Sequence, residues 1–218
     1  LADPHDPVFA QKRWGKMAVR AGRPLEEFMG LVHQVWARRE EVPNQIRAVA
    51  AKARARGLPM LSHDDTQSET RQFYRSVGAT VSEFPMTMDP VQDARGAGDA
   101  LIFGSPNVVR GGSHIGSLSA ADMVEAGLWD ALASDYYYPA MLAAVERLDR
   151  EKRKDRLSLW SLVSSGPARA MGLSDRGEIA VGKRADLVVV DWPDTGPPAV
   201  QSTWVAGRAA YQAQPFII

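Results

Sequence analysis

Residues 57–65 read GLPMLSHDD, an apolar run that follows a glycine and ends in a histidine and two aspartates. Three further segments share this arrangement: GATVSEFP at 78–85, GDALIFGSP at 98–106 and GLWDALASDYY at 127–137. The runs are too short for buried helices and too continuously apolar for strands with one solvated face. The pattern predicts four parallel strands, each preceded by a helix that a glycine terminates.

Helix-starting signals follow three of these runs. The segment 66–69 has the T-x-x-E spacing of a capping box, and 119–122 is a close relative of that motif. The Asp-Pro pair at 89–90 is a common helix opening. We expect Asp65 to cap the helix that begins at Thr66 rather than to take part in chemistry. Strands that alternate with helices indicate an α/β fold with a parallel sheet.

The flanking regions differ from this central repeat. Residues 23–40 and 42–57 predict two helices, and residues after 138 continue as helices with a charged middle at 149–156. Farther on, 185–191, 200–205 and a last piece after Gly207 indicate antiparallel strands with Gly and Pro turns. We therefore expect one α/β domain at 1–172 and a small all-β segment at 173–218.

The composition excludes several classes of function. The chain has 218 residues, with 26 Lys and Arg against 26 Asp and Glu, so its formal net charge is zero. That balance gives no overall attraction to nucleic acid or to an anionic membrane. There is no cysteine, which excludes disulfides, thiolate ligands and a Cys nucleophile and fits a reducing, cytoplasmic location. No run approaches the ~18–20 apolar residues of a membrane span.

Polar residues end the predicted strands, where the active sites of parallel α/β proteins lie. His63, Glu83 and Asp135 would converge there, and imidazole and carboxylate groups are usual ligands of zinc or manganese. A water on such a metal becomes acidic, and a neighbouring carboxylate base completes a hydrolase. Glu83 could equally be a strand-end residue that faces water.

The insertion NVVRGGSHIG at 107–116 is the best candidate for an anion site. Its glycines free the backbone to point N–H groups inward, and an arginine fork matches phosphate oxygens. The expected substrate-binding residues come from this insertion and from the end of the first strand. They are Arg110, Gly111, Gly112, Ser113, His114 and Asp64.

The tail resembles a known superfamily. SSGPARAMGLSDRGEIAVGKRADLVVVDW at 164–192, followed by TWVAGR at 203–208, is similar to the C-terminal signature of the amidohydrolase superfamily. The resemblance implies a metal-dependent (β/α)8 TIM barrel beside a small β-sandwich. It also implies that Gly177, Ile179, Gly182, Ala185 and Asp186 are scaffold residues.

The strand-end motifs narrow this resemblance. SHDD, EFP, NVVRGGSH-x-G and SDY, in this order, resemble the PhnM family of the carbon–phosphorus lyase pathway. Members hydrolyse α-D-ribose 1-methylphosphonate 5-triphosphate to the 5-phosphate and diphosphate. By resemblance, His63 is the metal-binding histidine of the fifth barrel strand, and Asp135, after the eighth, is the metal-linked base. Arg110 and His114 would hold phosphate or phosphonate, and Glu83 stands where many amidohydrolases carry a histidine.

One part of the superfamily pattern is absent. The H-x-H pair of the first barrel strand does not occur, and neither do the first three or so strands. Since a barrel takes ~250 residues, we expect the C-terminal half of one, completed by a second copy or by an N-terminal segment. Two alternatives stay open: an amidohydrolase acting on an amide or cyclic imide, or a catalytically inactive fragment that associates.

Overall fold

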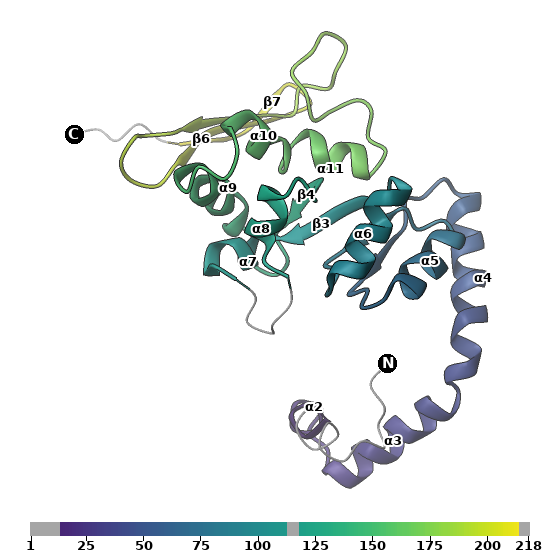
Figure 1. Cartoon of the computed structure of the whole chain (residues 1–218). Coiled ribbons are helices and arrows are strands. Elements are labelled where there is room, and N and C mark those ends of the chain that lie inside the picture. The colour runs from purple at the N-terminus through teal and green to yellow at the C-terminus, as the bar shows by residue number, and fades with distance from the viewer. Residues whose placement is uncertain (1–13, 113–117, 214–218) are drawn as a thin grey trace. The chain divides into compact units, whose positions relative to one another are not determined.

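The computed structural model describes residues 14–112 and 118–213 (Figure 1). The chain divides into two compact units, Leu1–Ala55 and Arg56–Ile218. The domain boundary that the sequence suggests near residue 172 falls inside the second unit and stays a prediction.

The first unit is helical in its described part. Its elements are α2 (Gly15–Arg20), α3 (Leu25–Ala37), the 3₁₀ helix η2 (Arg39–Glu41) and α4 (Val42–Ala55), which confirms the two helices predicted here. Helix α3 follows Pro24 directly, carries acidic residues in its first turn and has no buried residue. The acidic start suits the positive end of the helix dipole.

The second unit contains a four-stranded parallel sheet, and all four predicted strands are confirmed. They are β1 (Leu61–His63), β2 (Val81–Glu83), β3 (Ala100–Gly104) and β4 (Ala131–Ala133). The sheet order is β1-β2-β3-β4, with every pair parallel. Within the described ranges β1 and β4 are its edges, and closure into a barrel stays a prediction.

Helices connect these strands and continue after them. They are α5 (Ser68–Ser76), α6 (Met88–Ala97), α7 (Ser105–Arg110), α8 (Ala120–Glu125), α9 (Ala140–Arg150), α10 (Arg156–Ser161) and α11 (Ser165–Ala170). The predicted stops Gly57, Gly78, Gly98 and Gly127 all have positive φ, the conformation that lets glycine end a helix. In the part of the chain that the structure describes, no helix has the length and apolarity needed to cross a membrane.

The observed helix starts agree only in part with those predicted from the sequence. Ser119 caps α8 by accepting a hydrogen bond from the Asp122 backbone N–H at 3.3 Å, as predicted. The capping box at 66–69 is wrong, because α5 begins at Ser68 and no side chain caps it. Asp65 is not a cap either: it is fully buried and accepts hydrogen bonds from Ser62 and Ser82.

The two faces of the parallel sheet pack against different partners. On the outer face, Leu101, Phe103 and Leu132 join the main hydrophobic core with residues of the surrounding helices. On the inner face, Val81, Ile102 and Ala131 form a smaller cluster that the end of α11 helps to cover. Successive strand residues point to opposite faces, so His63 and Glu83 share the inner face with this smaller cluster.

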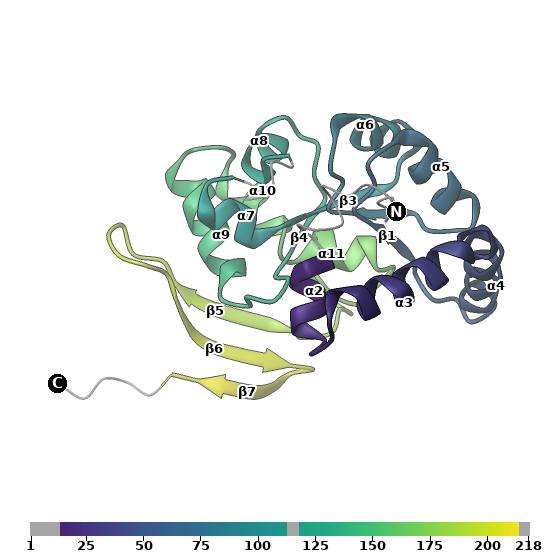
Figure 2. The ribbon, with the colours of Figure 1, turned by 90° about the horizontal axis from the view of Figure 1, so that it is seen from below.

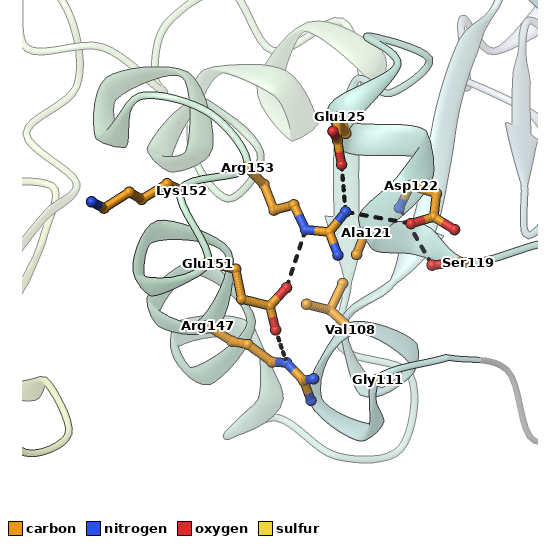
Figure 3. A pocket seen from close by; sticks show the side chains of 10 residues that line it. All are labelled: Val108, Gly111, Ser119, Ala121, Asp122, Glu125, Arg147, Glu151, Lys152 and Arg153. Carbon is orange, nitrogen blue, oxygen red and sulfur yellow. Dashed lines mark hydrogen bonds and ion pairs between the residues drawn. The ribbon is translucent and has the colours of Figure 1, made fainter.

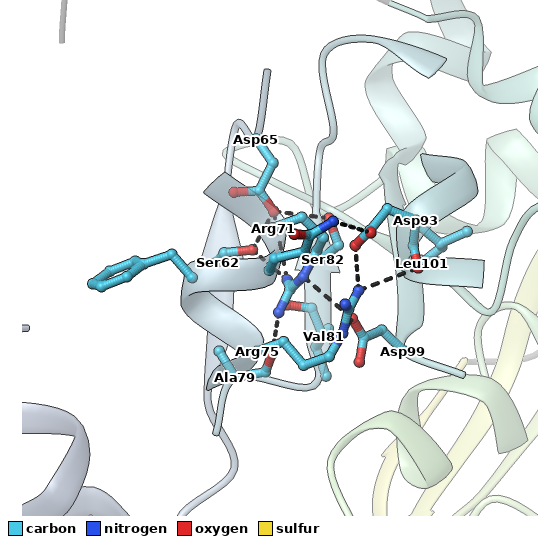
Figure 4. A network of polar contacts seen from close by, with 12 residues as sticks. Ser62, Asp65, Arg71, Arg75, Ala79, Val81, Ser82, Asp93, Asp99 and Leu101 are labelled. Carbon is cyan, nitrogen blue, oxygen red and sulfur yellow. Dashed lines mark hydrogen bonds and ion pairs between the residues drawn. The ribbon is translucent and has the colours of Figure 1, made fainter. Parts of the chain in front are cut away.

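Arg71 of α5 lies fully buried beneath the outer face, at the centre of a polar network (Figure 4). Its guanidinium donates hydrogen bonds to Ser62 Oγ and to the Val81 carbonyl, and its Nε lies 3.2 Å from Asp99. Burial lowers the pKa of Arg71, whereas Asp99 and Asp65 act in the opposite direction. The network therefore joins α5 to the first two strands.

A separate antiparallel sheet follows α11 (Figure 2). Its strands are β5 (Leu187–Asp191), β6 (Ala199–Val205) and β7 (Arg208–Gln212), which confirms the strands predicted in the tail. Trp192, just after β5, packs edge-on against Trp160 of α10 with ring centroids 6.0 Å apart. The second unit is therefore an α/β structure with a parallel sheet and a distinct antiparallel sheet.

Candidate functional site at the carboxyl ends of the parallel strands

His63 and Glu83 occupy the last positions of two neighbouring strands. They pair directly in the register of β1 and β2, and Glu83 pairs in turn with Ile102 of β3. Asp135 lies two residues beyond the end of β4. The parallel arrangement thus gathers at one edge of the sheet the residues that the sequence places at strand ends.

Three of these strand ends carry a residue in the left-handed backbone region. Asp64, Phe84 and Asp135 have φ values of 59°, 53° and 52°. This conformation costs a residue with a side chain roughly 1–2 kcal/mol, although aspartate tolerates it better than phenylalanine does. Backbone strain of this kind gathers at functional sites, where surrounding structure holds it in place. Its repetition along one edge favours a functional site there.

The imidazole of His63 is held on two sides. Its Nδ1 lies 3.1 Å from Asp64 Oδ2, and the ring meets Phe84 edge-on with centroids 5.2 Å apart. A carboxylate on one ring nitrogen orients a histidine so that the other nitrogen faces a ligand. The side chain remains 54% exposed.

Glu83 is half-buried between the other charged groups of this edge. Burial raises its pKa, Asp135 and Asp64 raise it further, and His63 opposes them. Glu83 therefore lies near enough to all three for their charges to act on it. The assignment of His63, Glu83 and Asp135 to one site stays a prediction.

A histidine and carboxylates are chemically suited to a divalent metal. However, residues 14–112 and 118–213 contain no group of three or more His, Asp or Glu side chains arranged to hold an ion. These residues alone therefore do not form a complete metal site. The metal set His63, Glu83 and Asp135 stays a prediction, and we assign no chemical step to a metal.

Three of the predicted anion-binding residues, Arg110, Gly111 and Gly112, lie at the end of α7, the helix that follows β3. Arg110 is exposed, and its Nη1 donates a hydrogen bond to the Tyr136 hydroxyl at 3.1 Å. Gly111 ends α7 with a φ of 82°, and Gly112 follows with a φ of 145°. Ser113 and His114 lie outside the described residues.

Tyr136 contacts a predicted site residue, and the sequence interpretation did not include it. Its hydrogen bond to Arg110 connects the end of α7 to the residue after Asp135. It is 71% exposed and begins a run of three exposed tyrosines. That run was the available signal, since exposed consecutive aromatic side chains are unusual away from binding surfaces.

Comparison with known sequences gives two related matches. The sequence model of a family described as "Amidohydrolase family" matches residues 111–211. Alpha-D-ribose 1-methylphosphonate 5-triphosphate diphosphatase of Escherichia coli (strain K12) is 39% identical over 177 residues, which is 80% of this chain and 46% of that protein. The chain thus spans about half the length of the curated relative that it matches.

Solved structures show the same fold. A prolidase crystallised with N-methylphosphonate-L-proline matches with a TM-score of 0.59 at 18% identity, over 78% of this chain and 49% of that one. A zinc-containing adenosine deaminase from Xanthomonas campestris matches with a TM-score of 0.52 at 17% identity, over 77% and 48%. The chain is thus similar to the amidohydrolase family over residues 111–211 and to the E. coli diphosphatase over 177 residues, and it shares the fold of these solved structures.

Proposed function

We propose that this chain contributes the strand-end site of a metal-dependent hydrolase that converts α-D-ribose 1-methylphosphonate 5-triphosphate to the 5-phosphate and diphosphate. The placement of His63, Glu83 and Asp135 at the carboxyl ends of one parallel sheet, next to residues with positive φ, carries the proposal. The similarity to the diphosphatase supports the choice of substrate. A soluble cytoplasmic enzyme with no nucleic-acid or membrane partner fits this function.

The roles follow from position and charge. Asp135 would accept a proton from the attacking water while the oxygen of that water forms a bond to phosphorus. Arg110 would neutralise the triphosphate, and the P–O bond to the leaving diphosphate would break. Asp64 would orient His63, from which its carboxylate lies 3.1 Å away. Gly111 and Gly112 donate their own N–H groups to the carbonyls of Val108 and Asn107, so in this proposal they shape the turn beside Arg110. We assign Ser113 and His114 to the phosphate subsite from sequence alone.

A divalent metal, zinc or manganese, would acidify the attacking water when bound. His63, Glu83 and Asp135 are the donors that this chain would offer, and the ion would need further ones. We propose that these come from additional barrel strands or from a second copy of the chain. The half-barrel assigned to residues 1–172 belongs to the same proposal.

Diphosphate release is the direct test. The natural polypeptide that carries this sequence should release diphosphate from the ribose methylphosphonate triphosphate when zinc or manganese is supplied. No release with either metal would refute the assignment. An Arg110→Ala variant separates this reaction from amide or cyclic-imide hydrolysis, because losing a charge-assisted contact should weaken use of a triphosphate by roughly 10-fold to 100-fold and matter little for a neutral amide.

A second candidate concerns the 218-residue chain by itself. The described residues assemble no group of three metal ligands, and the β1 edge exposes Leu58 and Leu61 by 53% and 42%. Both observations favour an inactive chain whose measurable behaviour is association through this edge. Metal analysis and sedimentation of the purified chain test it: a monomer with one tightly held metal would refute this candidate.

A further inference from the structure

Arg147 of α9 contacts the end of α7 next to Arg110. Its Nη1 donates a hydrogen bond to the Val109 carbonyl at 2.8 Å. The same guanidinium occupies the space where a side chain at Gly111 would begin: a Cβ there would lie 3.0 Å from Arg147 Nη2. A cation on the last carbonyls of a helix satisfies groups that the helix itself leaves unpaired.

Arg147 is the first member of a row of alternating charges that we call the charge ladder: Arg147, Glu151, Arg153 and Glu125 (Figure 3). Glu151 is its centre, because one carboxylate oxygen accepts from Arg147 Nε at 2.7 Å and the other from Arg153 Nε at 3.2 Å. Arg153 then contacts Glu125 of α8 and lies 3.5 Å from Asp122.

The ladder lines a cleft of about 630 Å³ formed by residues of α7, α8 and the end of α9 (Figure 3). It therefore connects the end of α7, which carries Arg110, to the helix that follows in the chain. Asn107 makes a second connection between α7 and the start of α8. Its side chain donates to the Leu118 carbonyl at 3.1 Å and accepts from the Ala120 N–H at 3.0 Å. The backbone on both sides of residues 113–117 is thus held by side chains outside that segment.

We propose that Arg147, supported by Glu151, is a positioning residue for Arg110. This inference rests on the proposed function, in which Arg110 binds the polyphosphate. Arg147 fixes the Val109 carbonyl and the turn at Gly111, and the backbone between them carries Arg110. Neither Arg147 nor Glu151 needs to touch the substrate in this role. Exposed ion pairs add little to global stability, so the ladder acts on the local backbone.

The test measures affinity for inorganic triphosphate by calorimetry on the full chain, together with amide hydrogen exchange by NMR. The informative amides are those of Gly111 and Gly112, which donate to the carbonyls of Val108 and Asn107 at 3.0 Å. Arg147→Ala should speed exchange at both amides and weaken triphosphate binding by about threefold to tenfold. Arg150→Ala is the matched control, because Arg150 lies on the same helix and carries the same charge but pairs with Glu146.

Glu151→Gln separates positioning from a simple effect of net charge. Removing a negative charge near a polyanion site should tighten binding if only the field matters. If Glu151 positions Arg147, the same substitution should weaken binding and speed exchange at Gly111. The variant keeps the shape of the side chain, so it remains informative if Arg147→Ala does not fold.

The outcomes divide clearly. Weaker binding and faster exchange in Arg147→Ala and Glu151→Gln, with Arg150→Ala unchanged, support the proposal. Unchanged exchange, unchanged affinity, or tighter binding in Glu151→Gln overturns it. If the unmodified chain and Arg110→Ala bind triphosphate equally well, Arg110 does not bind the anion, and Arg147 has no positioning role for it. Hydrogen exchange at Gly111 and Gly112 would then still report whether Arg147 holds the backbone at the end of α7.

Discussion

The two faces of the parallel sheet use the same strands for different purposes. On the outer face, Ser62 and Ser82 are buried, and every neighbouring charge has an opposite partner. On the inner face, one residue farther along each strand, His63 is half-exposed and Glu83 lies among other carboxylates. A shift of one residue therefore separates a buried network of paired charges from a half-exposed group in which carboxylates lie near one another.

The polar network on the outer face supports the strained residues that follow the strands. The Arg71 network holds β1, β2 and α5 together, and the strained residues Asp64 and Phe84 follow those same two strands. Strained conformations persist only where surrounding structure over-determines them. The buried network on the outer face thus helps to hold Asp64 and Phe84 in their strained backbone conformations at the ends of β1 and β2.

Breaking the outer face should have the largest effect. Arg71→Leu leaves Asp65 buried without its cation and leaves Asp99 with Arg75 alone, and we expect the free energy of unfolding to fall by about 3–5 kcal/mol. Arg75→Leu is the matched control, since Arg75 also pairs with Asp99 but is 26% exposed, and it should cost about 1 kcal/mol. Urea denaturation of both variants measures the contrast, and equal costs would show that burial of Arg71 is not what matters.

On the inner face, Asp135→Asn should act on the reaction and not on folding. If Asp135 is the base, diphosphate release should fall by at least ~10²-fold while the denaturation midpoint stays within error. Single-turnover measurements at saturating triphosphate isolate the chemical step. Activity within threefold of the unmodified protein would exclude Asp135 as the base.

Strain at Asp64 can be measured directly. With its φ of 59°, glycine should be favoured over alanine there, so Asp64→Gly should be more stable than Asp64→Ala by about 1 kcal/mol. At Gln72, inside α5, the order should reverse by a similar amount, because glycine weakens a helix interior. Denaturation of the four variants tests both signs; the same order at both positions would contradict a strained strand end.

The smallest expected effect is a pH dependence at Glu83. Because its folded-state pKa is raised, Glu83 stabilises the fold fully below its unfolded pKa, and that contribution is lost as the pH rises through the folded pKa. Glu83→Gln should therefore raise the thermal midpoint at neutral pH by about 1–3 °C and have no effect in acid. Thermal scans without added metal at both pH values check this, and a lower midpoint at neutral pH would contradict it.

Much of the architecture was accessible from the sequence. The glycines at 57, 78, 98 and 127 marked the helix ends, and the apolar runs after them form the four parallel strands that the sequence predicted. These features depend on local backbone preferences and on burial, which a short window of sequence contains.

The features that the sequence concealed depend on contacts between distant residues. Asp65 resembled a helix cap because aspartate commonly caps helices, but its partner Arg71 lies in a helix of mostly polar composition. Nothing in that pattern marks one arginine as buried. The bond between Arg110 and Tyr136 joins residues 26 positions apart, and only the fold brings them together.

The order of the strands along the sheet has a kinetic consequence. Each strand pairs with its predecessor in the chain, and partners such as Leu61 and Val81 are only about 20 residues apart. Closing loops of this size costs little more entropy than closing shorter ones, and a predominance of near contacts speeds folding. The sheet can therefore grow one strand at a time, so each added βα unit finds a finished edge on which to form.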